Sequence, residues 1–294
     1  MKITLTGSLG NIGKPLAKTL IAAGHQVTIV SSNAGKTAAI EALGAKAAIG
    51  LISDAAFLTK AFTGANAVYT MVPPNMATTD YRKYVGDSAK NYVEAITKAG
   101  VTQVVNLSSI GAHLDGGTGQ ISGVHDAELI LNELEGMDIK HIRAGFFYVN
   151  FLANIDMIKH LGFLGSNYSA AARLVLVHPN DIAAAIAEEI QQPITGKSVR
   201  YVTSDERTAG EIAAILGTAI GKPDLKWAEF TDEQSLEGML QAGLPAEASR
   251  LFVQMGTAIR SGILWEDYDA KGTQPTGKTK LEDFAKEFGV AYAY

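Results

Sequence analysis

Apolar and polar positions repeat with two periods along the first half of the chain, and stretches of the two kinds alternate. Short apolar runs typical of strands occupy residues 2–5, 24–30, 45–50, 65–72, 101–108 and 139–143. Between them, apolar residues recur at helical spacing, most clearly from about Asp80 to Lys98, a stretch followed by Gly100. Strands that alternate with helices build a parallel sheet with helices on both faces. The pattern therefore predicts an α/β fold with a doubly wound parallel sheet, the Rossmann arrangement.

The pattern becomes irregular after Gly145, where short segments of both kinds follow one another. A further strand is expected at 196–202, with helices on either side of it. We predict a dinucleotide-binding domain over residues 1–145 and a smaller, mixed α/β substrate lobe over 146–294. The two are expected to interleave as one continuous unit.

Three glycines spaced as Gly7-x-x-Gly10-x-x-Gly13 join the first strand to the first helix. In a dinucleotide site the first glycine allows a tight turn, the second leaves room for the pyrophosphate, and the third lets the helix lie close to the sheet. The helix N-terminus then faces the phosphates. We predict cofactor contacts along this loop from Gly7, Leu9, Gly10, Asn11, Ile12 and Gly13. The alternative is a glycine turn that only joins strand and helix.

The end of the second strand bears on the choice of cofactor. NAD-selective sites usually place an acidic residue there for the ribose 2′-hydroxyl, but no acid occurs between Lys2 and Glu41. Hydroxyls, an amide and a cation suit a 2′-phosphate instead. We therefore favour NADP(H) over NAD(H), with contacts from Ser31, Ser32, Asn33 and Lys36. The alternative is that these are only turn residues.

Ligands of an open parallel sheet bind beyond the carboxyl ends of its strands. Val72 and Pro73 follow the fourth strand, and Ser108 and Ser109 end the fifth. We expect Val72, Pro73 and Ser108 to contact the cofactor and Ser109 to contribute to catalysis. The alternative for the two serines is a polar strand ending.

His125 follows a glycine-rich loop and is predicted to open a helix, from which imidazole could donate to a substrate oxygen near neutral pH. An ordinary solvated loop histidine is the alternative. Asp126 and Glu128 are interpreted as first-turn acids of that helix. Tyr148 is a further catalytic candidate, in an aromatic stretch that either walls a pocket or belongs to the core.

Composition excludes several classes of protein. The chain has 294 residues, 47% of them hydrophobic, and a net charge of −5, which does not indicate a nucleic-acid surface. It has no cysteine, so disulfides, thiol catalysis and cysteine metal sites are excluded. No histidines have metal-ligand spacing, and no apolar run approaches the ~18 residues of a membrane span. We expect a cytoplasmic protein without signal peptide, bound metal or nucleic-acid partner.

Several motifs together resemble the NmrA-like atypical short-chain dehydrogenases/reductases. Besides the glycine triad and Ser108-Ser109, they include the segment Ile142–Asn150 and the pattern Val177-x-x-x-Asp181. The chain is most similar to the bacterial NAD(P)H:quinone reductase type, because His125 stands eleven residues before Gly136. This resemblance implies that His125 lies beside the nicotinamide.

The acid–base pair of ordinary short-chain dehydrogenases, Tyr-x-x-x-Lys, is absent, since no tyrosine has lysine four residues later. A quinone needs little acid catalysis, so we expect an NADPH-dependent reductase of a quinone or a similar small planar carbonyl compound. One alternative is an NmrA-like redox sensor that binds dinucleotide without turnover and acts on a protein partner. Another is an NAD-dependent epimerase or dehydratase-like enzyme, which would require an acid–base pair that the sequence does not show.

Overall fold

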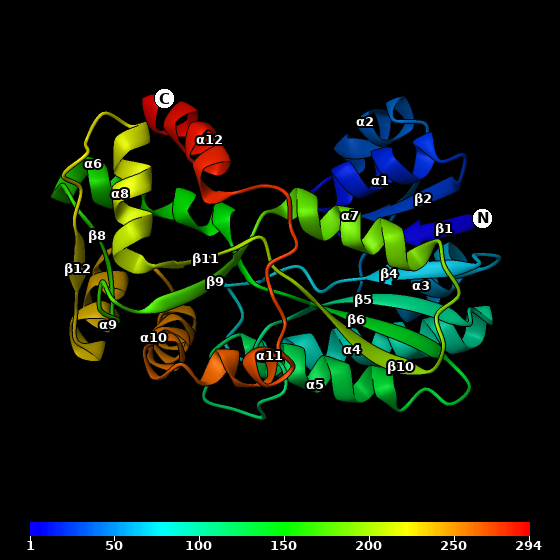
Figure 1. Cartoon of the computed structure of the whole chain (residues 1–294). Helices are drawn as coiled ribbons and strands as arrows, with labels where there is room; N and C mark the ends of the chain where they lie inside the picture. The colour runs from blue at the N-terminus through cyan, green and yellow to red at the C-terminus, as the bar shows by residue number, and fades with distance from the viewer.

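A seven-stranded parallel sheet forms the centre of the larger lobe in the computed structural model, which describes residues 1–294 (Figure 1). Its spatial order is β10-β6-β5-β4-β1-β2-β3. Ile3 of β1 lies opposite Val27 on one side and Ala67 on the other, so the strand order reverses at β1. The predicted doubly wound sheet is confirmed, with strands β1 (Lys2–Leu5), β2 (Gln26–Ser31), β3 (Lys46–Ile49), β4 (Ala67–Thr70), β5 (Gln103–Ser109), β6 (Asp138–Ala144) and β10 (Lys197–Val202).

Helices cover both faces of this sheet (Figure 1). One face carries α1 (Gly13–Ala22) and α7 (Pro179–Ile190), with short α2 (Thr37–Ala42) beside β3. The other carries α3 (Ala55–Phe62), α4 (Tyr81–Ala99) and α5 (Ile121–Asn132). Separate apolar cores fill the two interfaces, and burial of this aliphatic and aromatic surface is what holds the layers together.

Local sequence signals explain where these helices begin and end. The Asp54 carboxylate accepts the Phe57 N–H at 2.9 Å, and Asp80 does the same for Lys83 at 2.9 Å. Gly100 ends α4 in the left-handed conformation at φ 68°, where a Cβ would be strained. None of the helices combines the length and hydrophobicity that crossing a bilayer requires.

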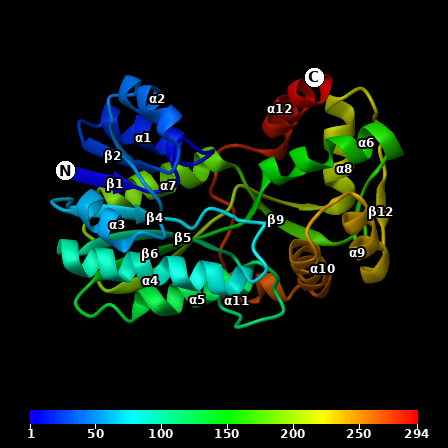
Figure 2. The same cartoon turned by 180° about the vertical axis from the view of Figure 1, so that it is seen from behind.

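The smaller lobe contains two short sheets surrounded by helices (Figures 1 and 2). One sheet has the order β11-β9-β7 and the other pairs β12 with β8. The strands are β7 (Phe146–Phe147), β8 (Leu164–Ser166), β9 (Arg173–Val177), β11 (Asp205–Thr208) and β12 (Trp227–Glu229). The helices are α6 (Ile155–Leu161), α8 (Ala209–Ala219), α9 (Asp232–Gln241), α10 (Ala246–Ser261), α11 (Glu266–Ala270) and α12 (Leu281–Ala293), with the short 3₁₀ turns η2 (Tyr148–Asn154) and η3 (Ile263–Trp265). A third 3₁₀ turn, η1 (Ala34–Lys36), belongs to the larger lobe, where it joins β2 to α2.

The chain passes between the lobes several times. After β6 it enters the smaller lobe, returns with α7 and β10 to the central sheet, and leaves again through β11. Because β6 continues directly into β7, and β10 into β11, the carboxyl edge of the central sheet faces the smaller lobe. Any ligand bound at that edge lies within reach of both lobes.

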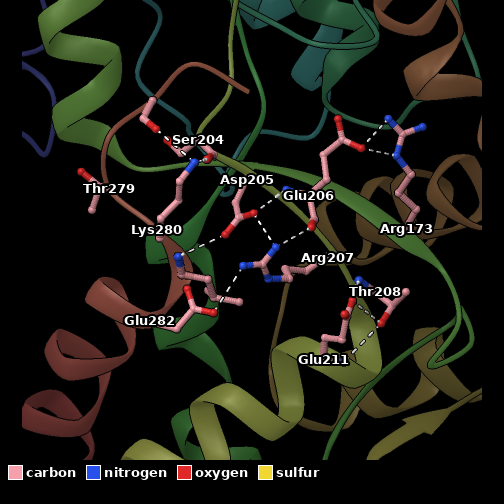
Figure 3. A network of polar contacts seen from close by, with 12 residues as sticks. Arg173, Ser204, Asp205, Glu206, Arg207, Thr208, Glu211, Thr279, Lys280 and Glu282 are labelled. Atoms are coloured by element: carbon pink, nitrogen blue, oxygen red, sulfur yellow. Dashed lines mark hydrogen bonds and ion pairs between the residues drawn. The ribbon is translucent and has the colours of Figure 1, made fainter. Parts of the chain in front are cut away.

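A polar network fastens the smaller lobe to this edge (Figure 3). Lys280 donates to the carbonyl of Ser204 at 2.6 Å, and Arg207 lies between Asp205 and Glu282, at 2.7 and 3.3 Å. The segment before α12 is thereby held across the ends of β10 and β11.

Candidate functional site

The glycine loop follows β1 at the point where the strand order reverses. Gly7 has φ 88°, and Ser8, at φ 56°, is the one non-glycine residue with positive φ. A Cβ on Gly7 would lie 2.9 Å from the side chain of Met71, and one on Gly13 would lie 2.2 Å from the carbonyl oxygen of Ser8. Gly13 therefore lets the start of α1 lie against the backbone of Gly7 and Ser8, which follows β1.

The backbone N–H groups of Gly10, Asn11, Ile12 and Gly13 have no acceptor within the protein. Gly10 is exposed, and a Cβ there would meet only the carbonyl oxygen of Gly7, at 3.3 Å. Free N–H groups at the beginning of a helix, with open space before them, form an anion-binding site. The loop therefore fits a pyrophosphate.

Ser31 ties the glycine loop to the end of β2. Its hydroxyl accepts from the Ser8 hydroxyl at 2.9 Å and from the Asn33 N–H at 3.2 Å, and the residue is 3% exposed. The Asn33 carboxamide oxygen caps η1 by accepting the Gly35 N–H at 2.8 Å. Ser32 is exposed and Lys36 half-exposed, and neither side chain makes a hydrogen bond or an ion pair. The groups free to meet a 2′-phosphate are therefore Ser32, Lys36 and the Asn33 amide nitrogen.

Two tyrosines of α4 hold the segment after β4. Tyr92 donates to the carbonyl of Met71 at 2.6 Å, and Tyr84 donates to that of Pro73 at 2.9 Å. Val72 and Pro73 are half-buried and lie between these two anchors. The structure thus fixes this segment beside the glycine loop, where Met71 contacts Gly7.

A buried ion pair lies under the ends of β5 and β6. Arg143 donates to Glu128 through Nε at 3.0 Å and Nη2 at 2.7 Å, and Ser108 donates to the same carboxylate. These three residues are between 5% and 8% exposed. The interpretation of Glu128 as a first-turn acid is wrong, because it lies in the second turn of α5 and neutralises Arg143. The Ser108 hydroxyl is enclosed in this network.

The network continues into α11. Arg143 Nη1 donates to the Tyr201 hydroxyl at 3.1 Å and to Asp267 at 3.2 Å, and Tyr201 in turn donates to Asp267. Burial opposes the charge of Asp267, but hydrogen bonds from Lys271 and Tyr201 outweigh it and hold the pKa of this carboxyl below its usual range. These contacts hold the smaller lobe against the carboxyl edge of the sheet.

His125 is the fifth residue of α5, so the prediction that it opens the helix is wrong. Its Nδ1 lies 2.9 Å from the carbonyl oxygen of Ala112 and donates to it. Nε2 has no partner in the protein and is not enclosed. Ala112 belongs to the loop after β5, where the half-buried Ser109 donates to the Ile110 carbonyl at 2.9 Å. The structure therefore brings Ser109 and His125 to one loop and leaves one imidazole nitrogen free.

Asp126, the residue after His125, was interpreted as a first-turn acid, which is wrong for the same reason as for Glu128. Its carboxylate accepts from Arg82 Nε at 2.5 Å and Nη2 at 2.8 Å. This pair joins α5 to the first turn of α4.

Residues 7–132 match a family model described as NAD(P)H-binding. This range contains the glycine loop, the free N–H groups and α5 with His125. It is an NAD(P)H-binding domain. A comparison with curated protein sequences matches none of them.

Solved structures similar to the whole chain are reductases and sugar epimerases. A nucleoside-diphosphate-sugar epimerase from Staphylococcus aureus has a TM-score of 0.79 and 21% identity, covering 97% of this chain and 100% of that one. NADPH-dependent quinone oxidoreductase QOR2 from Escherichia coli, complexed with NADPH, has a TM-score of 0.81 and 22% identity over 97% and 99%. Triphenylmethane reductase from Citrobacter sp. has a TM-score of 0.80 and 19% identity over 99% and 100%.

These matches are consistent with the resemblance to NmrA-like short-chain dehydrogenases/reductases and bear it out at the level of fold and domain. The low identities show the fold only.

Tyr148, the third catalytic candidate, lies away from the NAD(P)H-binding domain, in the core of the smaller lobe. It is fully buried, its ring stacks on Phe284 at 5.5 Å between centroids, and its hydroxyl donates to the Thr279 carbonyl at 3.3 Å. Burial raises the pKa of this phenol well above its usual range. The structure gives Tyr148 no contact with His125 or Ser109, and the aromatic stretch around it is core.

His113 lies in the segment from Ser108 to His113, where the sequence places candidate chemistry, although no role was assigned to this residue. Both of its ring nitrogens are enclosed and have no hydrogen-bond partner in the NAD(P)H-binding domain or elsewhere. Burial lowers the pKa of the imidazole, so it is neutral at physiological pH. It follows Ala112 directly, and its place in the loop after β5 was the signal that could have found it.

Proposed function

We propose that this protein is an NADPH-dependent reductase of a quinone or a similar small planar carbonyl compound. The observation that carries the proposal is the state of His125. Its Nδ1 is held by Ala112, in the loop that follows the carboxyl end of β5, and its Nε2 is free. One oriented donor next to a hydride source is the minimum that reduction of a quinone requires.

Cofactor binding is assigned to groups that are otherwise without partners. The free N–H groups of Gly10–Gly13 would hold the pyrophosphate, and Ser32, Asn33 and Lys36 would surround the 2′-phosphate. The absence of an acidic side chain at the end of β2 supports NADPH over NADH, as do similar structures described as complexes with NADPH and NADP(H). The bound dinucleotide supplies a hydride, which is two electrons and one proton.

The acceptor needs one more proton to become a hydroquinone, and His125 is placed to manage it. In the protonated imidazolium, Nδ1–H stays on the Ala112 carbonyl and Nε2–H donates to the oxygen on which negative charge develops. The neutral imidazole that remains takes a new proton from solvent at Nε2, because this nitrogen is accessible. The aromatic hydroquinone already stabilises that charge, so a single donor replaces the missing Tyr-x-x-x-Lys pair.

Substitution of His125 tests this role. His125→Ala should lower kcat with a quinone by about a hundredfold, the usual effect of losing one such donor. The Kd for NADPH should stay unchanged, because the phosphate site lies at the other end of the cofactor. His160→Ala is the matched control, since that exposed histidine only bonds its own helix, at Asp156. An unchanged kcat in His125→Ala would show that orientation alone suffices and that the histidine is not catalytic.

The missing acid–base pair equally favours a second candidate, a redox sensor that binds NADPH without turning it over and acts through a protein partner. The two differ in one result, because a sensor binds NADPH tightly and oxidises none with any quinone or carbonyl compound. An epimerase-like reaction has less support, since no tyrosine–lysine pair of the usual spacing is present.

A further inference from the structure

A cavity of about 310 Å³ lies where three segments meet: the first turn of α4, the loop before α5, and α10. Figure 2 shows the beginning of α4 beside α10, although the two are far apart in the sequence. Its lining includes Arg82, Gly119, Ser122, Glu247, Arg250 and Leu251. Most of the side chains around it are polar, although polar and apolar surface contribute about equally to the lining.

The cavity begins one helical turn from the proposed catalytic imidazole. Ser122, in its wall, precedes His125 by three residues on α5, so the two occupy neighbouring positions on one helix face. Asp126, directly after His125, holds Arg82 of the opposite wall. A ligand that reaches His125 from the smaller lobe therefore has this cavity beside it.

The loop before α5 is pressed firmly against α10. A Cβ on Gly119 would lie 2.1 Å from the carbonyl oxygen of Leu251, and the residue has φ 63°, so only glycine fits. Gly116 and Gly117 have no neighbours where a Cβ would stand. The loop thus closes one end of the cavity and leaves space in its middle.

Arg82 of α4 and Arg250 of α10 both line the cavity, and both guanidinium groups retain free donors. Arg82 uses Nε and Nη2 for Asp126, and Arg250 uses Nη2 for Glu247 at 2.7 Å. Nη1 of Arg82 and both Nε and Nη1 of Arg250 have no partner in the protein. Each arginine has one acid partner, so the cavity offers free guanidinium N–H donors rather than a net positive charge. Planar guanidinium donors of this kind suit planar oxyanions.

We infer that this cavity binds an acidic substituent, a carboxylate or a sulfonate, on the aromatic acceptor that is reduced at His125. The inference rests on the proposed function and narrows its substrate class to aromatic acceptors that carry an anionic group. Arg250 is the specificity-determining residue, since it has two free donors and its acid partner is held on its own helix.

A pair of quinones tests this specificity. The parent should show a lower KM for 1,4-naphthoquinone-2-sulfonate than for 1,4-naphthoquinone, and Arg250→Gln should reduce that preference by about tenfold, the value of one charge-assisted contact. The quantity compared is the ratio of the KM values for the two quinones, measured once in the parent and once in Arg250→Gln. The difference in redox potential between the quinones affects both ratios equally and therefore cancels. Arg200→Gln is the matched control, because Arg200 pairs with Glu188 and Glu189 on the other side of the sheet. A preference that is unchanged in Arg250→Gln would overturn the inference.

A binding measurement separates this inference from the proposed function. Naphthalene-2-sulfonate cannot be reduced, so calorimetric titration of the NADP⁺-loaded protein reports the cavity alone. Binding that weakens about tenfold in Arg250→Gln supports the anion site even if no quinone is turned over. If the parent does not bind naphthalene-2-sulfonate, or if parent and variant bind it equally, the anion site is overturned. The proposed quinone reduction is not affected by that result. Arg250 has a side chain 61% exposed, so the variant should fold normally.

Discussion

Single residues of the glycine loop are needed for different reasons. Gly7 and Gly13 are required by the fold, because a Cβ on either would collide with Met71 or with the backbone of Ser8. Gly10 has ordinary φ, and a Cβ there would make one tight contact, 3.3 Å to the Gly7 carbonyl oxygen, which a shift of a few tenths of an ångström would relieve, so the fold depends less on glycine at this position. A substitution at Gly10 should therefore affect ligand binding more than stability, and the two effects can be measured separately.

Gly10→Asp should abolish NADPH binding while leaving stability within about 0.5 kcal/mol of the parent, the usual range for an exposed substitution. The carboxylate would fill the phosphate site and repel it. Fluorescence titration measures the affinity and urea unfolding the stability. Gly238→Asp is the control, since Gly238 on α9 also has open space around it. If Gly10→Asp binds NADPH as the parent does, the pyrophosphate lies elsewhere.

Ser32 tests the choice between the two cofactors. NADPH should bind the parent at least about tenfold more tightly than NADH, since a charge-assisted contact contributes roughly 1.5–3 kcal/mol. Ser32→Asp should remove or reverse this preference, because a carboxylate repels the 2′-phosphate and accepts from a 2′-hydroxyl. The measurement is the dissociation constant of NADPH and of NADH, each for the parent and for Ser32→Asp. Equal affinities in the parent would mean that the end of β2 is only a turn.

At the scale of helices and strands, the buried pair of Glu128 and Arg143 joins α5 to β6. Removing one partner of a buried pair costs up to about 3–5 kcal/mol, and without Glu128 the guanidinium of Arg143 keeps only Asp267, a carboxylate that Lys271 shares. Glu128→Gln should therefore lower the free energy of unfolding by that order. Glu94→Gln removes an exposed partner of Lys98 on α4 and should cost at most about 0.5 kcal/mol. Similar losses in the two variants, measured by urea unfolding, would show that the buried pair does not stabilise the interface.

The elements and their caps could be predicted because their signals are local. Asp54, Asp80 and the Thr208–Glu211 capping box each bond a backbone group within three residues. Glu128 was misjudged because its partner is 15 residues away, and its spacing in the sequence does not tell which face of the helix is buried. In the same way, nothing near Ser31 in the sequence indicates that Ser8 binds its hydroxyl. In both cases the partner comes from a distant part of the chain. The spacing of apolar and polar residues along the sequence does not identify such partners.

At the scale of the whole molecule, a neutral histidine in the core makes folding sensitive to acid. His141 is 1% exposed, accepts from the Asn106 amide at 3.2 Å and donates to Asn132 at 3.0 Å. Burial lowers its pKa, so below about pH 6.5 the unfolded chain binds a proton that the folded protein does not.

Stability should therefore fall as the pH drops below about 6.5, by at most ~1.4 kcal/mol per unit for this residue. Urea unfolding at several pH values between about 7 and 5 measures this, and His141→Gln should show a shallower dependence over the same range. An equal slope in the variant would assign the acid sensitivity to other groups.

We propose that the carboxyl edge of the sheet holds NADPH and that an acceptor reaches His125 from the side of the smaller lobe. The most direct test is steady-state oxidation of NADPH by the parent protein with tetramethyl-1,4-benzoquinone, whose ring has no open carbon for addition by lysine. The account predicts catalytic loss of NADPH in step with formation of the hydroquinone, abolished in Gly10→Asp and strongly reduced in His125→Ala. Tight NADPH binding without oxidation by this or any related quinone would contradict it and identify the protein as a sensor.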